Sequence, residues 1–210
     1  MGHLRLGRLP KTRRWAEVID LLDAGTDGPA ALADAVIRAA EHRLSQLAND
    51  QGLGYNFWLL TRIAWAARGQ DFAESLSALG INVGPNASSL QVIAQVADRV
   101  RTELSSAPSS GDFAEIGSLA LRTALTDTVA QQGPSFFGSS LDDLQNAFRA
   151  YSTQVQFGRL AHRFFSDFFA RVLRSYVDRE LANHVGSARS LSGYCLIAVA
   201  RKMRVGGVVG

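Results

Sequence analysis

Apolar residues recur along most of the chain every three to four positions, the spacing that places them on one face of an α-helix. Glycine, proline and cap-forming residues interrupt the pattern at intervals, and no segment shows the sustained alternation of a half-buried strand. The pattern predicts an all-α fold: an irregular bundle of seven to eight helices with one long Phe-rich C-terminal helix. The expected helices cover residues 11–24, 29–51, 55–68, 72–79, 88–104 and 113–131, then a segment that starts at 141 and continues, after a break near Gly158, into the long helix ending near Asn183.

Several predicted helix ends carry recognisable cap residues. Ser140 followed three residues later by Asp143 resembles a capping box, and Asp112 is placed to cap the helix that follows it. The two glycines of Gly52-Leu53-Gly54 are expected to form a loop, so the next helix is predicted to begin at Tyr55.

The segment 57–67 is apolar nearly all round, with Arg62 as the main exception. A helix that is hydrophobic on every side must be surrounded by protein, and this one is too short to cross a membrane. The favoured interpretation is a central core helix. In the alternative interpretation, Trp58 or Trp65 points outward as an interface anchor.

The long helix carries more apolar surface than a single core requires. From Arg159 to Leu181, its large apolar residues cover an arc of about 220°, whereas about 100° is enough to face one core. The helix therefore packs against two groups of neighbours or shows part of its aromatic face to a partner. The residues that would form this interface are Phe164, Phe165, Phe168 and Phe169.

Charge is concentrated at the two ends of the chain. The net charge is +3, of which residues 1–14 contribute +5 and residues 187–210 contribute +4, leaving −6 for the body. We expect three parts: a basic N-terminal arm (1–10), a helical bundle domain (11–186) and an atypical C-terminal tail (187–210).

Two groups of cations suggest phosphate or nucleic-acid contacts, because cationic arms bind phosphate backbones. One group is in or beside the arm, where leucines and not stacking aromatics separate the cations. The other lies on the polar side of the long helix, where i, i+4 pairing with Asp167 and Asp178 is the favoured explanation. The candidates are Arg5, Arg8, Lys11, Arg13, Arg14, Arg159, Arg163, Arg171 and Arg174.

Site chemistry is sparse. The four histidines lack the helical spacing of paired metal ligands, there is one cysteine, and no nucleotide-binding or nucleophile motif is present. We therefore expect no catalytic, cofactor-binding or metal-binding residue, and a helical enzyme is the least favoured hypothesis. No signal peptide or membrane span is recognised, which favours the cytoplasm, and the dominance of Arg over Lys suggests a bacterial source.

The favoured function is a non-catalytic helical interaction subunit or adaptor of a bacterial multiprotein assembly, with a protein partner or self-association. Two alternatives remain: a nucleic-acid-binding protein that uses the basic arm and the arginine strip, and a membrane-active helical protein that makes peripheral contact through its aromatic helix.

Overall fold

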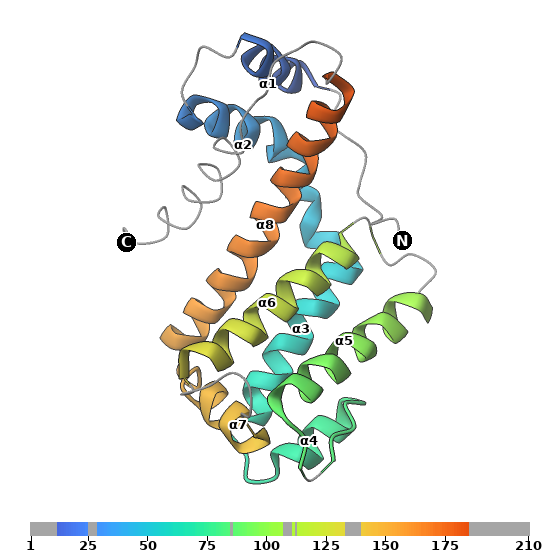
Figure 1. Cartoon of the computed structure of the whole chain (residues 1–210), viewed down its shortest axis with the longest axis vertical. Helices are drawn as coiled ribbons and strands as arrows, with labels where there is room; N and C mark the ends of the chain where they lie inside the picture. The colour runs from blue at the N-terminus through green and yellow to red at the C-terminus, as the bar shows by residue number, and fades with distance from the viewer. Residues whose placement is uncertain are drawn as a thin grey trace. The chain divides into compact units, whose positions relative to one another are not determined.

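A computed structural model of the chain describes residues 12–24, 29–84, 86–106, 111, 113–132 and 140–184. Within these ranges the chain forms eight α-helices, one short 3₁₀ helix and no strand, which confirms the predicted all-α bundle (Figure 1). The elements are α1 (Arg13–Ala24), α2 (Pro29–Ser45), η1 (Gln46–Asn49), α3 (Gln51–Ala66), α4 (Phe72–Ala78), α5 (Ser89–Ser106), α6 (Ala114–Gln132), α7 (Leu141–Arg149) and α8 (Gln154–His184). The predicted arm at 1–10, the tail at 187–210 and the proposed cap Asp112 lie outside the described residues.

The chain divides into two compact units, with the boundary inside α8. Unit 1 consists of the described residues within Met1–Asn49 and Phe168–Gly210, and unit 2 of those within Asp50–Asp167. The expectation of one bundle domain at 11–186 stays a prediction.

Unit 1 is built from α1, α2, η1 and the second half of α8. Trp15 on α1 is only 3% exposed and meets Tyr176 of α8 edge to face, with ring centroids 5.9 Å apart. Val18 and Val36 are fully buried on α1 and α2. The apolar face predicted for residues 11–24 therefore does line a core.

Unit 2 is centred on the contact between α3 and α6, the most extensive helix pair in the described chain. Figure 1 shows α3, α5 and α6 running lengthwise, with α4 and α7 near one end of them. Asn56 on α3 is fully buried and donates through Nδ2 to the carbonyls of Gly52 at 2.8 Å and Ala114 at 3.2 Å. A Cβ at Gly117 of α6 would lie 3.1 Å from that same Nδ2, so the glycine permits the close approach of the two helices.

The structure corrects two predicted boundaries. α3 begins at Gln51 and not at Tyr55, because Asp50 caps it: its Oδ1 accepts from the Leu53 N–H at 2.8 Å. The break before the long helix lies between α7 and α8 and not at Gly158, which is inside α8. Thr153 forms that boundary, since its hydroxyl accepts from the Gln156 N–H at 3.3 Å.

The predicted capping box of α7 is confirmed. The Ser140 hydroxyl accepts from the Asp143 N–H at 3.2 Å, and the Asp143 carboxylate accepts from the Ser140 N–H at 2.8 Å. The Asp143 carboxylate accepts from the Ser140 N–H and also from the Ser140 hydroxyl, at 3.0 Å, and these two bonds to its charged form lower the pKa of Asp143 below its ordinary value. Ser88 and Gln91 exchange equivalent bonds at the start of α5.

Candidate interaction site

A line of residues along the outer side of α3 is largely open to solvent. It consists of Gly54, Trp58, Thr61, Trp65 and Arg68, and we call it the α3 stripe. Trp58 is 46% exposed and Trp65 63% exposed, while Gly54 and Arg68 are also exposed and Thr61 is half-buried. Exposed side chains of this size are uncommon, because burying a tryptophan removes a large apolar area from water.

The opposite side of α3 explains why the tryptophans face outward. Leu59, Leu60 and Ile63 are fully or almost fully buried, and they occupy the side of the helix that packs in the core of unit 2. Both sequence interpretations of this helix therefore hold in part. It is a core helix along one side, and Trp58 and Trp65 point out along the other, as the interface alternative requires.

Trp58 packs against Tyr55 of the same helix, and Tyr55 in turn contacts Arg99 of α5. The rings of Tyr55 and Trp58 are stacked, with centroids 5.5 Å apart and planes 30° apart. The Arg99 guanidinium lies over the Tyr55 ring, 5.7 Å from its centroid. Trp58 is thus half exposed but has a defined neighbour that restricts its ring.

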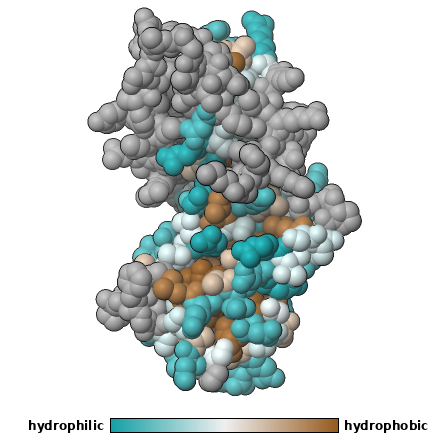
Figure 2. Space-filling model, turned by 45° about the vertical axis from the view of Figure 1, so that its right-hand side comes forward, coloured by the Kyte–Doolittle hydropathy of each residue, from teal (hydrophilic) through white to brown (hydrophobic). Residues whose placement is uncertain are grey.

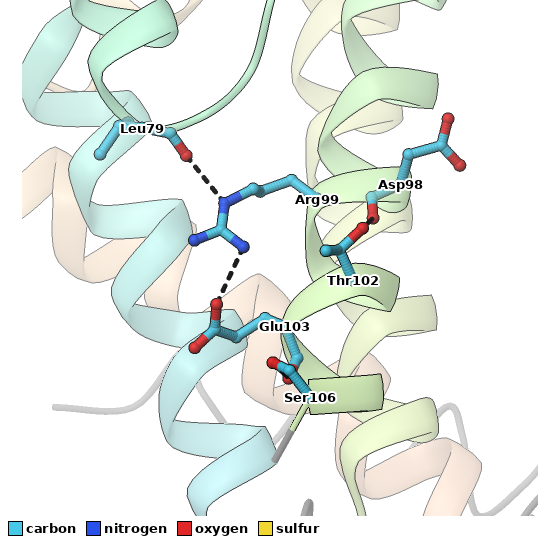
Figure 3. Close-up of polar contacts among 6 residues, drawn as sticks. All are labelled: Leu79, Asp98, Arg99, Thr102, Glu103 and Ser106. Carbon is cyan, nitrogen blue, oxygen red and sulfur yellow. Dashed lines mark hydrogen bonds and ion pairs between the residues drawn. The ribbon is translucent and has the colours of Figure 1, made fainter.

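Arg99 is itself fixed by two hydrogen bonds, which Figure 3 shows. Its Nε donates to the Leu79 carbonyl at 3.1 Å, and its terminal NH1 donates to the Glu103 carboxylate at 2.9 Å. Gly80 adopts a φ of +76°, and a Cβ there would lie 2.8 Å from Arg99 Nε. The loop after α4 therefore needs glycine to admit the guanidinium. We call Tyr55, Leu79, Arg99 and Glu103 the Arg99 cluster.

The Tyr55 hydroxyl is the unusual group of this cluster. It is buried and has no hydrogen-bond partner among the described residues. Burial raises the pKa of Tyr55, the positive charge of Arg99 opposes that rise, and Glu103 adds to it. The phenol is therefore neutral near pH 7 and serves the cluster through its ring.

The far end of the stripe is also held in place. The Arg68 guanidinium lies over the Trp65 ring, 4.7 Å from its centroid. Side chains of α7 satisfy carbonyls just after the end of α3: Arg149 Nε donates to Ala67 at 2.9 Å and Gln145 Nε2 to Gly69 at 2.8 Å. Both ends of α3 are thus capped by other residues of unit 2.

One exposed arginine belongs to the stripe, and a second lies beside it. Arg62 is exposed one residue beyond Thr61, and Arg68 is exposed at the end of the stripe. Residues 51–70 contain no aspartate or glutamate. In Figure 2, the brown apolar areas among the described residues in view are separated by teal and white side chains.

The predicted phenylalanines of α8 are placed mainly inside the protein. Phe164 and Phe168 are fully buried, while Phe165 and Phe169 are half-buried. In unit 2, Phe57 of α3 packs against Phe164 and Phe165, with ring centroids 5.6 Å and 4.8 Å apart. The wide aromatic arc therefore serves packing at Phe164 and Phe168, while a partner contact at the half-buried Phe165 and Phe169 stays a prediction.

The candidate arginines are divided between the two units, and several are engaged by the chain itself. Arg14 bonds to Glu41 at 3.0 Å, and Arg163 donates to the Tyr151 hydroxyl at 3.2 Å and to Gln131 at 2.9 Å. Arg159 bonds to Gln156 at 3.3 Å. The remaining described candidates are Arg13 and Arg174, which are exposed, and Arg171, which is half-buried; Arg5, Arg8 and Lys11 lie outside the described residues.

In the part of the chain that the structure describes, no group of three or more His, Cys, Asp or Glu side chains is arranged to hold a metal ion. None of the described helices combines the length and apolar character needed to cross a bilayer.

No protein-family model, curated protein or solved structure matches this chain. Functional inference therefore rests on the residues themselves. Sequence reasoning identified Trp58 and Trp65 but missed the Arg99 cluster, whose members come from three separate segments. The sequence did carry a signal for Arg62 and Arg68, because both lie close to the tryptophans in a segment without aspartate or glutamate.

Proposed function

We propose that the protein is a non-catalytic helical interaction subunit of a bacterial, cytoplasmic multiprotein assembly, and that it engages its partner through the α3 stripe. The observation that carries the proposal is the exposure of Trp58 and Trp65 on one line of a helix whose other side is core. Tryptophan and arginine are the residues most enriched at the energetic centres of protein interfaces.

The support of the tryptophans strengthens this proposal. Binding costs free energy when free side chains must be ordered. Here the stack on Tyr55 and the cation–π contact with Arg68 already restrict the rings of Trp58 and Trp65. A partner would meet an aromatic surface that is largely in its bound arrangement.

The nucleic-acid alternative has less support. Two of its predicted contacts, Arg14 and Arg163, already use their guanidinium groups in bonds to the chain's own side chains. The membrane alternative relied on the aromatic face of α8, and Phe164 and Phe168 of that face are fully buried. Neither alternative accounts for the two outward tryptophans as directly as a protein partner does.

A crosslinking experiment tests the proposal in cells. A photo-activatable amino acid replaces Trp65, and in a matched control it replaces Val155, which is 69% exposed on α8. We expect a specific protein to be crosslinked from position 65 and not from position 155. The captured protein is then purified, and its affinity is measured for wild type, Trp65→Ala, Trp58→Ala and Val155→Ala.

The affinity measurement decides the outcome. Removing an anchor residue costs about 2 kcal/mol or more, equivalent to an affinity loss of about 30-fold. We expect such a loss for Trp65→Ala and Trp58→Ala, and less than about 2-fold for Val155→Ala. Equal affinity for all four proteins, or crosslinking from both positions alike, would overturn the proposal.

A further inference from the structure

We infer that the α3 stripe receives an acidic α-helix of a partner protein, packed lengthwise along α3. This inference rests on the proposed function and specifies the kind of partner. It follows from the spacing of the stripe, from its charge, and from the groups that hold it.

The spacing of the stripe is that of a helix–helix seam. Gly54, Trp58, Thr61, Trp65 and Arg68 are separated by four, three, four and three residues. Positions repeating every 3.5 residues stay in contact with a second helix over several turns, as in coiled coils. At 1.5 Å per residue the stripe is about 21 Å long, which matches about four turns of a partner helix.

The polar side chain in the middle of the stripe already donates its hydrogen bond within α3. The Thr61 hydroxyl donates to the Phe57 carbonyl in its own helix, at 2.9 Å. A Cβ at Gly54 would meet nothing within 4 Å, so the surface beside it is open at this end. An apolar side of a partner helix can therefore lie between the two tryptophans.

Charge selects an acidic partner. In a heptad description with Trp58 and Trp65 at the a positions, Arg62 occupies an e position, beside the seam, where charged residues choose the partner. Arg68 continues the seam at its end, and residues 51–70 contain no aspartate or glutamate. Glutamate or aspartate flanking the apolar side of the partner would complement both.

The same charges fit poorly to a polyanion or a lipid surface. Nucleic-acid backbones are bound by many cations along a groove, whereas only Arg62 and Arg68 are cationic in residues 54–68. An interfacial helix inserts a broad apolar side into lipid, but most of the apolar side of α3 is buried in unit 2.

Two synthetic peptides of 21 residues test the inference on the full chain. Both carry leucine at heptad positions a and d; one has glutamate at e and g, and the other has lysine there. Binding is followed by tryptophan emission, because Trp58 and Trp65 are exposed while Trp15 is 3% exposed and serves as a constant background. Parallel titrations use a 20-nucleotide oligo-dT strand and phosphatidylserine vesicles.

We expect the glutamate peptide to bind with a blue shift of the emission and the lysine peptide to bind at least about 10-fold more weakly. Arg62→Glu should reverse that preference. Arg122→Glu, which alters an exposed arginine on α6, should leave it unchanged.

The inference is overturned if neither peptide binds, if both bind equally, or if Arg62→Glu changes nothing. Stronger binding of oligo-dT or of vesicles also overturns it, and would indicate a nucleic acid or a lipid surface. Because the crosslinking experiment does not depend on the partner's charge, success there with failure here would reject the acidic helix alone.

Discussion

Gly158 provides a direct test of the continuity of α8. The glycine lies in the fifth position of the helix and is exposed, and a Cβ added there would meet nothing within 4 Å. Glycine costs about 0.5–1 kcal/mol relative to alanine in a helix interior, because it loses more backbone freedom on folding. Gly158→Ala should therefore raise the free energy of unfolding by about 0.5–1 kcal/mol. For a chain of this length that corresponds to a rise in Tm of about 1–4 °C.

The assay is chemical denaturation of the full chain followed by far-UV circular dichroism, with Gly117→Ala as the matched control. Gly117 is also helical, but a Cβ there would lie 3.1 Å from the buried Asn56 Nδ2. The same substitution should therefore destabilise the protein at position 117, because the contact between α3 and α6 must shift. Opposite signs at the two glycines would show that space, and not residue type, decides the effect.

The result at Gly158 also separates the structure from the break predicted by the sequence. A kinked or interrupted helix would use the freedom of glycine, and alanine would then be neutral or destabilising. A stability change of zero or below for Gly158→Ala would refute the argument that α8 passes through this position as regular helix.

Three further predictions follow from caps and from the Arg99 cluster. Asp50→Ala should lower the free energy of unfolding by about 1–2 kcal/mol, measured by denaturant titration, because the Asp50 carboxylate accepts backbone N–H groups at the start of both α3 and α6. The control, Asp71→Ala, should lower it less, since Asp71 makes no side-chain cap bond. Tyr55→Phe should leave stability unchanged or raise it by up to about 1 kcal/mol, because the buried hydroxyl has no partner among the described residues, and a clear loss would contradict this. Asp143→Asn should destabilise the protein near pH 7, because Ser140 holds the pKa of Asp143 below its ordinary value of 3.8 and the charged form contributes stability above that value. The difference from wild type should shrink as the pH falls below 3.8 and through the folded pKa, and a pH-independent difference would argue against this reasoning.

Local sequence signals were sufficient to predict where most helices lie. They were misread at the starts of α3 and α8. The capping box of α7 is readable because a serine and an aspartate three residues apart form it entirely within one turn. The start of α8 carries a similar signal, Thr153 followed by Gln156, but Gly158 drew attention as the more obvious breaker. At α3, the two glycines at 52 and 54 suggested a loop, whereas Asp50 caps a helix that contains both of them.

The orientation of the α3 tryptophans was beyond local patterning. In most helices a polar side shows which side faces solvent. A helix that is apolar nearly all round has no such side, so its sequence does not show which side is buried. The side is chosen by tertiary contacts: Asn56 bonds to the Ala114 carbonyl 58 residues away, and the glycine at 117 lets α6 approach. Once that side of α3 is fixed against α6, Trp58 and Trp65 must face away from it.

The residues that form the core of unit 2 differ from the residues that form the exposed α3 stripe. The core of unit 2 is completed by residues such as Leu59 and Ile63, and the exposed portions of Trp58 and Trp65 add little to it. Trp58 nevertheless stacks against the Tyr55 ring, Arg99 lies over that ring, and the turn at Gly80 leaves room for the Arg99 guanidinium. Support of that kind has a physical consequence for binding, because a ring held in place before association loses less entropy when a partner covers it. The Arg99 cluster therefore belongs with the proposed interaction site, although its members lie beside the stripe and not on it.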